Sequence, residues 1–310
     1  MPECPMTSSQ YTMTASHSCN RARAWAALVM LWSLVIGTMG LSTSAAEPTK
    51  PLTLPANWPA GTAVQYEIIR VKENVRAGVT NLSRVRTPLT IAVIERTPAG
   101  YRLAWTTGRS TVEEPKQLDA SQQRLLNIAD GLKLILRTDA AGTPEELVNR
   151  VEVAGIYKKI LGEIRANLAA AGMAAEKIAQ ATTPVEALAQ PERVPAIALK
   201  EPNILFLVTG GEFVLGRARE YEDQLPNPLT GKALVTRARM TLKEGRAAAG
   251  EALIEWSQEP KALEPNFTLR DIASCLVDTK TGWPKRVLFE RTVTVGSAQR
   301  IERTELLAKP

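Results

Sequence analysis

The stretch from Ile272 to Val295 constrains the fold most, because its apolar and polar side chains alternate with a period of two. The alternation is interrupted once, at Asp278–Pro284, where glycine and proline supply the chemistry of a tight turn. Alternation on both sides of such a turn is the sequence signal of a β-hairpin. We therefore expect two antiparallel strands here, near the centre of a larger antiparallel sheet.

The same alternation recurs along most of the chain and predicts further strands. They are expected at Thr62–Lys72, Leu89–Val93, Tyr101–Trp105, Leu132–Leu136, Arg217–Glu222, Leu234–Leu242, Ala252–Trp256 and Arg300–Leu307. With the central hairpin, the pattern predicts about nine or ten strands. Short turns between consecutive strands favour antiparallel pairing.

In the middle of the chain the apolar period changes from 2 to 3.6 residues. Thr143–Glu146 has the form of a capping box with proline at the first helical position, although Pro144–Asn149 could instead be one more short strand. Val153–Leu168 places its apolar residues on one helical face. Ala174–Ala181 fits a second helix, and Thr183–Glu186 repeats the capping-box form and predicts a third.

These patterns predict an α+β protein, with an antiparallel sheet and a central block of helices on one face; the resemblance described below implies that the sheet is curved and half-barrel-like. Residues 62–310 are expected to form a single domain with the helical insertion at about 143–205. Residues 47–61 carry four prolines and are expected to be extended, as a tether or a sheet edge. Asn203–Val208 fits either a buried helix or a strand.

Residues 1–46 have the features of a secretory signal peptide. Arg21 and Arg23 precede the apolar run Ala24–Leu41, and small residues follow it at Ser44–Ala46. The alternative is an uncleaved membrane anchor, since the run approaches spanning length. Cleavage would leave no stable membrane anchor. We therefore expect an exported protein, either periplasmic or secreted.

The composition excludes several kinds of chemistry once the leader is removed. The single histidine, His17, lies in the leader, as do two of the three cysteines, and only Cys275 remains. A Ser-His-Asp or Cys-His mechanism, or a histidine-ligated metal, would then lack its side chains. We therefore predict a non-catalytic protein with no metal and no cofactor. The formal net charge of +6 over 310 residues is modest, so a nucleic-acid partner is not expected.

Basic residues on strands are the candidate binding residues. Arg237 and Arg239 occupy alternate positions of one predicted strand and therefore share a face. Arg70, Lys72 and Arg76 lie near the end of the first predicted hairpin. If such residues converge, they could bind anionic lipid headgroups or polymers. The alternative is that they line the solvent-exposed face of a half-buried sheet.

The turn Asp278–Pro284, followed by Lys285–Glu290, resembles turns of many uncharacterised secreted bacterial domains. Together with the strand pattern, it resembles bacterial envelope proteins of the lipoprotein-carrier type, in which a curved antiparallel half-barrel wraps a helical plug. The resemblance implies an apolar ligand on the concave face, although the helices could equally fill that face. No functional residue is transferred by it. Trp283, within the turn, is a further candidate ligand contact.

Three functions are compatible with these features. The first is an exported non-catalytic protein that binds an apolar or amphipathic ligand or a cell-envelope partner, such as a lipid or an envelope protein. The second is a carboxylate-dependent hydrolase using Asp271 or Glu255, which requires two carboxylates about 5–10 Å apart in a cleft. The third is a structural or interaction module that pairs a sheet edge with a partner strand.

Overall fold

The computed structural model describes residues 50–310 apart from residues 116–117, 119–121, 124–125, 127–129, 229, 231, 247–249 and 263–264. The predicted signal peptide, residues 1–46, lies outside the described residues. Cleavage and export therefore stay predictions from the sequence. No helix of the described part is long and apolar enough to cross a membrane.

A large antiparallel sheet dominates the described residues. It consists of β2 (Ala63–Arg76), β3 (Val79–Thr97), β4 (Gly100–Thr107), β5 (Thr111–Glu114), β6 (Lys133–Thr138), β7 (Pro144–Leu147), β9 (Ala218–Pro226), β10 (Ala233–Arg246), β11 (Glu251–Pro260), β12 (Phe267–Asp278), β13 (Pro284–Val295) and β14 (Ala298–Ala308). A second, two-stranded sheet pairs β1 (Leu52–Thr53) with β8 (Glu212–Phe213). The helices are α2 (Arg150–Ala170), α3 (Ala175–Leu188), α4 (Pro195–Ala198) and α5 (Lys200–Leu205).

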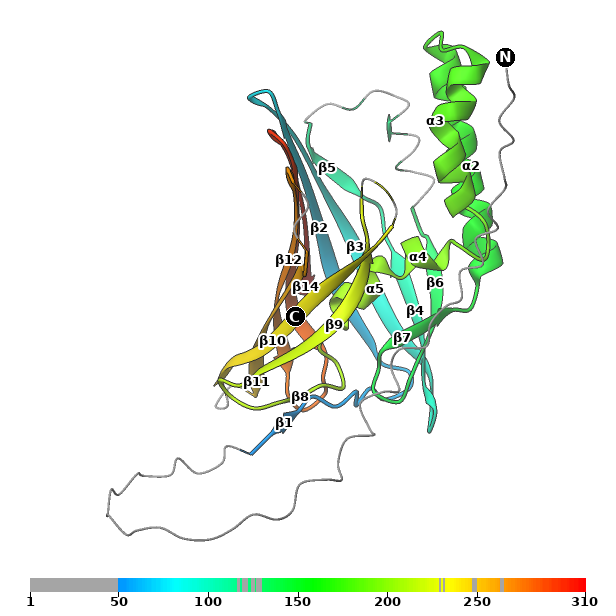
Figure 1. Cartoon of the computed structure of the whole chain (residues 1–310). Coiled ribbons are helices and arrows are strands. Elements are labelled where there is room, and N and C mark those ends of the chain that lie inside the picture. The colour runs from blue at the N-terminus through cyan, green and yellow to red at the C-terminus, as the bar shows by residue number, and fades with distance from the viewer. Residues whose placement is uncertain are drawn as a thin grey trace, which may run out of the picture. The chain divides into compact units, whose positions relative to one another are not determined.

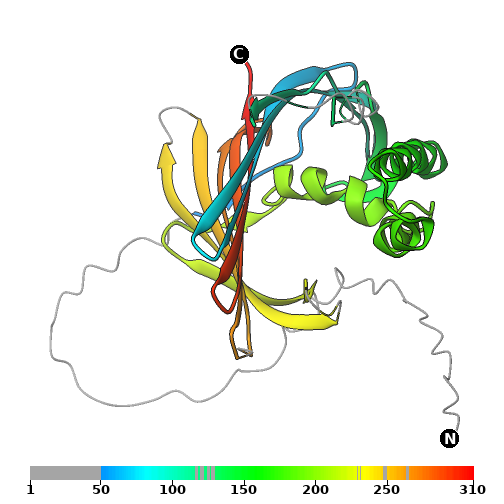
Figure 2. The ribbon, with the colours of Figure 1, turned by 90° about the horizontal axis from the view of Figure 1, so that it is seen from above.

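The main sheet consists of two meanders that are joined in its middle by the pairing of β2 with β14, the first and last of its strands in the sequence. Its order is β7-β6-β4-β3-β2-β14-β13-β12-β11-β10-β9, with β5 paired to β3. Neighbouring strands pair antiparallel, and this includes the pairing of β14 with β2. The path ends at β7 and β9, which do not pair with each other, so the sheet is open. It curves around α4 and α5, as Figures 1 and 2 show.

The α+β prediction is wrong, because the protein is mainly β. Strands make up 52% of the structure and helices 19%, and the main sheet has 12 strands rather than nine or ten. Of the two alternatives at Pro144–Asn149, the strand is the one that forms, as β7, and its Glu145 and Glu146 both form ion pairs with Arg137 of β6. Cross-strand pairing thus determines the secondary structure of a segment whose local pattern also fitted a helix start. The second capping-box form, Thr183–Glu186, lies inside α3.

The helices do not form one block on one face. α4 and α5 lie against the concave face, whereas α2 and α3 pack on each other as a hairpin that projects beyond the strands (Figure 1). Leu161 of α2 and Ile178 of α3 are buried. Arg165 of α2 also donates hydrogen bonds to the side chains of Thr182 and Glu186 of α3. Asn203–Val208 begins as α5 and continues as a turn, which supports the helical alternative for that segment.

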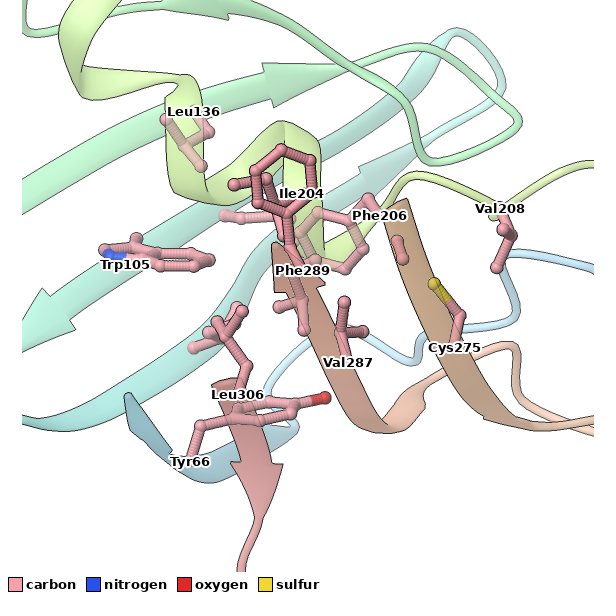
Figure 3. Close-up of a cluster of buried hydrophobic side chains, with 14 of the residues drawn as sticks. Tyr66, Trp105, Leu136, Ile204, Phe206, Val208, Cys275, Val287, Phe289 and Leu306 are labelled. Atoms are coloured by element: carbon pink, nitrogen blue, oxygen red, sulfur yellow. The ribbon is translucent and has the colours of Figure 1, made fainter. Parts of the chain in front are cut away.

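The core lies on the concave face, between the sheet and α5. The strands place every second side chain there, and Tyr66, Phe289 and Leu306 are all buried. Ile204 and Phe206, at the end of α5, point into the same cluster (Figure 3). This part of the concave face is therefore filled by the protein's own side chains.

From residue 50 onward, the described part of the proline-rich segment packs into the core. Leu54 and Trp58 are fully buried, each 0% exposed. The segment is fixed by backbone hydrogen bonds of 3.0 Å from Leu54 N–H to the Gly211 carbonyl and 2.8 Å from Gly210 N–H to the Leu54 carbonyl. Prolines keep the chain extended, and the two large side chains between them supply the apolar surface that anchors it.

The central hairpin is confirmed: β12 and β13 pair from Phe267↔Val295 to Val277↔Pro284. Its turn is held by Asp278, whose Oδ1 accepts hydrogen bonds from the N–H groups of Lys280 and Thr281 at 3.0 and 2.9 Å. Gly282 has a φ of +73°, and a Cβ there would lie 1.8 Å from the Pro55 carbonyl oxygen. Only glycine therefore allows the turn to contact the buried N-terminal segment.

Replacing Gly282 by alanine is expected to lower the free energy of unfolding by roughly 3 kcal/mol, because strain at positive φ is added to a backbone clash. Gly78, with a φ of +78° and nothing within 4 Å of the point that a Cβ would occupy, is the matched control. Its replacement should cost only about 1 kcal/mol. Urea unfolding followed by circular dichroism compares the two, and equal losses would contradict the close approach.

Candidate functional site

The inward-facing side chains of the sheet change from apolar to charged along the strands. On β2, Tyr66 and Ile68 are buried in the core, and the next positions on the same face are Arg70, Lys72, Asn74 and Arg76. The register places Arg70, Lys72 and Asn74 opposite inward residues of β14. The concave face therefore has an apolar half and, toward the β2–β3 and β13–β14 turns, a polar half.

A groove of about 490 Å³ lies in this polar half. We call it the end groove. It is lined by Asn74, Val75, Arg76, Lys200, Pro228, Arg291, Val293, Val295, Ala298, Gln299, Arg300 and Glu302. These residues come from the paired strands β2, β13 and β14, from the first residue of α5 and from the β9–β10 connection. Segments far apart in the sequence thus form one site.

Two carboxylates form ion pairs with basic side chains in and beside the end groove. Asp271, 1% exposed, accepts two hydrogen bonds from Arg291, Nε at 2.8 Å and Nη2 at 2.6 Å. Glu302 contacts both Arg300 and Lys200, the latter at 3.2 Å. Burial alone would raise the pKa of Glu302, but the charges of Lys200 and Arg300 outweigh burial and lower the pKa. Glu302 is therefore held as a carboxylate.

The position of Lys200 is fixed by the neighbouring residue of α5. Glu201 forms a bidentate ion pair with Arg70 of β2, one contact of which joins Nη2 to Oε2 at 2.7 Å. Arg70 also donates to Thr87 Oγ1 of β3 at 2.9 Å. α5 is thus attached to the sheet at the boundary between the apolar core and the end groove.

The structure separates the residues proposed from sequence as ligand contacts. Arg237 and Arg239 lie side by side on the outer face of β10, opposite to the buried Ala238. They line an outer-face hollow of about 590 Å³ with Glu259 and Lys261. Arg239 also lines a hollow of about 670 Å³ over β10–β13. Their role in binding stays a prediction.

Trp283 lies apart from these two arginines, against Trp58 of the N-terminal segment and Phe206 after α5. It is half-buried, and its ring stacks on Trp58 with a centroid distance of 4.6 Å. Phe206 lies 6.0 Å from it by the same measure. The turn tryptophan therefore supports the packing of the N-terminal segment, and the basic pair Arg237 and Arg239 is not brought to it.

The two carboxylates considered for a hydrolase lie on opposite faces of the sheet. Asp271 faces inward and is paired with Arg291, whereas Glu255 faces outward, 53% exposed, and pairs with Lys243 at 3.1 Å. These two groups therefore do not converge in one cleft. Among the described residues, no three histidine, cysteine, aspartate or glutamate side chains are grouped so that they could hold a metal ion. Cys275 is buried, and burial raises the pKa of its thiol to about 12.

Sequence reasoning finds one side of the end groove and misses the other. Arg76, with Lys72 and Arg70, is a candidate for a basic patch near the first hairpin end. Arg291 and Arg300 are not, because their approach to Arg76 depends on the pairing of β14 with β2. The available signal is the alternation along β14, which places Arg300 on the same face as Leu306.

Comparisons with known proteins assign no family. No family model matches the chain, and no curated protein matches it. Among solved structures, an outer membrane channel from Pseudomonas putida is 10% identical, with coverage of 85% of this chain and 98% of the channel, at a TM-score of 0.16. A TM-score this low carries no argument about fold or function. The class is therefore described by geometry alone: an open, mainly antiparallel β protein with a groove on its concave face.

Proposed function

We propose that this protein is a non-catalytic binding protein and that the end groove holds an amphipathic ligand. The observation that supports the proposal is the composition of the groove, in which Val293, Val295 and Ala298 lie beside charged side chains. Its volume of about 490 Å³ lies within the range of roughly 300–1,000 Å³ typical of small-molecule sites. A ligand with an apolar tail and a polar head would satisfy both kinds of surface.

The filled apolar half of the concave face restricts where the ligand lies. Phe206, 2% exposed, and Leu205, 0% exposed, occupy the space between α5 and the sheet. A tail inserted there would have to displace well-packed side chains, which is unfavourable. The proposal therefore places the ligand near the turns at the open end of the strands, beyond the Arg70–Glu201 pair.

Strand addition is not favoured by the edge strand β9. Arg219 and Asp223 of β9 lie opposite Met240 and Thr236 of β10, whose side chains face inward. Inward-pointing charges on an edge strand hinder its pairing with another strand. The envelope location of the protein stays a prediction from residues 1–46, and the proposal does not depend on it.

The proposal is tested by titrating the purified protein with the neutral fluorescent probe N-phenyl-1-naphthylamine and by native mass spectrometry for a co-purifying amphipath. Val293→Asp is expected to weaken probe binding about tenfold or more, because a charge is placed in the apolar wall. Val235→Asp, at an outward position that is 46% exposed, is the matched control and should bind like the unmodified protein. A protein that binds no probe, or equal losses in both variants, would contradict the proposal.

A further inference from the structure

We infer that the ligand of the end groove has an anionic headgroup, a carboxylate or a phosphate, held by Arg76 and Arg300. The inference rests on the proposed function and specifies the chemistry of the ligand. Arg300 of β14 lies opposite Asn74 of β2, and Arg76 is the next residue of β2 on the same face. The two guanidinium groups therefore line the same end of the groove, and Lys200 of α5 is a further lining residue.

The end groove contains more positive charge than its own carboxylates neutralise. Arg76, Lys200, Arg291 and Arg300 line it, and Glu302 is its only acidic lining residue among those the structure describes. Asp271 compensates Arg291 through two hydrogen bonds. Glu302 is shared between Lys200 and Arg300. Arg76 forms no ion pair with any residue in the described part of the chain, so an anion bound in the groove would meet uncompensated cations.

On the outer face of β13 and β14, unlike in the end groove, the basic side chains are paired with acidic ones. There, Arg286 of β13 pairs with Glu305 of β14 at 2.7 Å. Arg303 of β14 pairs with Glu290 of β13 at 2.5 Å. Outward charges of these two strands thus form local cross-strand pairs, as expected for a solvated sheet face. The excess of cations on the concave face is therefore not a general property of β13 and β14.

The apolar wall adjoins the cations in a way that suits an amphipath. Val293 of β13 lies directly opposite Arg300 of β14, and Val295 lies opposite Ala298. Side chains paired in this way stand roughly 4.5–5.5 Å apart at their Cβ atoms. A headgroup at Arg76 and Arg300 would thus leave the first carbons of its chain against the two valines. Guanidinium groups bind carboxylate and phosphate oxygens in the same bidentate geometry, so both headgroups fit.

The test measures displacement of N-phenyl-1-naphthylamine by three ten-carbon amphipaths below their micellar concentrations: decanoate, decyl phosphate and decyldimethylamine oxide, which has no net charge. The unmodified protein is expected to bind the better of the two anions about tenfold more tightly than the amine oxide. In the double variant Arg76→Gln/Arg300→Gln this preference should fall to about twofold or less, because binding of the anions weakens far more than binding of the amine oxide. Decanoate and decyl phosphate together show which anion the groove prefers.

Two further double variants remove the same charge elsewhere. Lys158→Gln/Lys159→Gln alters residues of α2, away from the groove, and its preference for anions should equal that of the unmodified protein. Arg237→Gln/Arg239→Gln tests the outer-face pair. The inference is overturned if the amine oxide binds as tightly as both anions, a result that leaves the proposed function standing. It is also overturned if Lys158→Gln/Lys159→Gln or Arg237→Gln/Arg239→Gln loses the preference for anions as fully as Arg76→Gln/Arg300→Gln does. Failure of all three amphipaths to bind would reject the proposed function itself.

Discussion

Replacing Trp58 by alanine is expected to lower the free energy of unfolding by about 3–5 kcal/mol, the range for truncating a buried aromatic side chain. Trp58 is 0% exposed, and its ring lies 4.6 Å from Trp283, 4.9 Å from Tyr101 and 5.0 Å from Phe206 between centroids. Truncation would leave a large cavity between the N-terminal segment, the central hairpin and the end of α5. These surroundings come from separate elements and cannot easily collapse to fill it.

Urea unfolding followed by far-UV circular dichroism measures this loss. Trp58→Phe is the informative companion, because it keeps an aromatic ring and removes an indole N–H that lacks a hydrogen-bond partner among the described residues. The Trp58→Phe variant should lose about 1–2 kcal/mol of stability, because fewer buried atoms are removed and the cavity left behind is smaller. Val151→Ala, at a site 71% exposed, should change stability by less than about 0.5 kcal/mol. A Trp58→Ala protein as stable as the Val151→Ala protein would show that the segment is not anchored.

Replacing Asp271 by alanine is expected to lower the free energy of unfolding by about 3 kcal/mol, because the largely buried Arg291 loses its bidentate partner. The side chain of Asp271 is 2% exposed and that of Arg291 is 27% exposed. The remaining access of Arg291 to water places the expected loss at the lower end for a broken buried pair. The measurement is the midpoint of urea unfolding at neutral pH. An unchanged dependence of the free energy of unfolding on urea concentration would show that the unfolded state is the same.

The exposed pair of Lys243 and Glu255 is the matched control, with side chains 48% and 53% exposed. Glu255→Ala should cost no more than about 1 kcal/mol, because exposed ion pairs contribute little. The double variant Asp271→Leu/Arg291→Met should recover most of the loss, since apolar side chains of similar volume can replace a buried ion pair. If the double variant is as unstable as Asp271→Ala, the destabilisation does not arise from the unpaired arginine.

The parts of the fold set by local pattern were predictable from the sequence. Period-two alternation located the central hairpin and the strands on both sides of it, because alternate burial is a local property of a sheet. The fold class was wrong because the protein is mainly β, with 52% of the structure in strands and 19% in helices. At β7 the strand alternative is the one that forms, and its ion pairs with Arg137 of β6 are contacts between strands that the pattern of one segment does not contain. The core role of Trp58 was missed for the same reason.

The candidate site was predictable only in part. The register of β2 alone places Arg70, Lys72 and Arg76 on one face, and the sequence indicated this patch as a site for anions. The partners Arg291, Arg300 and Lys200 reach it through strand pairing and through the placement of α5 on the concave face. Arg237 and Arg239 share a face, as expected, but this face is the outer one. This placement agrees with the alternative of a solvent-exposed sheet face, because Ala238 and Met240, which alternate with the two arginines, are buried.

The place of β14 between β2 and β13 has a consequence for how the chain reaches its native state. β2 can complete its ladder only with a strand from the far end of the sequence, and Glu67 contacts Lys309 across 242 positions. Folding slows as contacts become less local, so formation on the order of milliseconds to seconds is expected rather than microseconds. Until β14 is available, β2 presents an unpaired edge. A ribosome-bound chain would thus stay incompletely folded until β14 emerges.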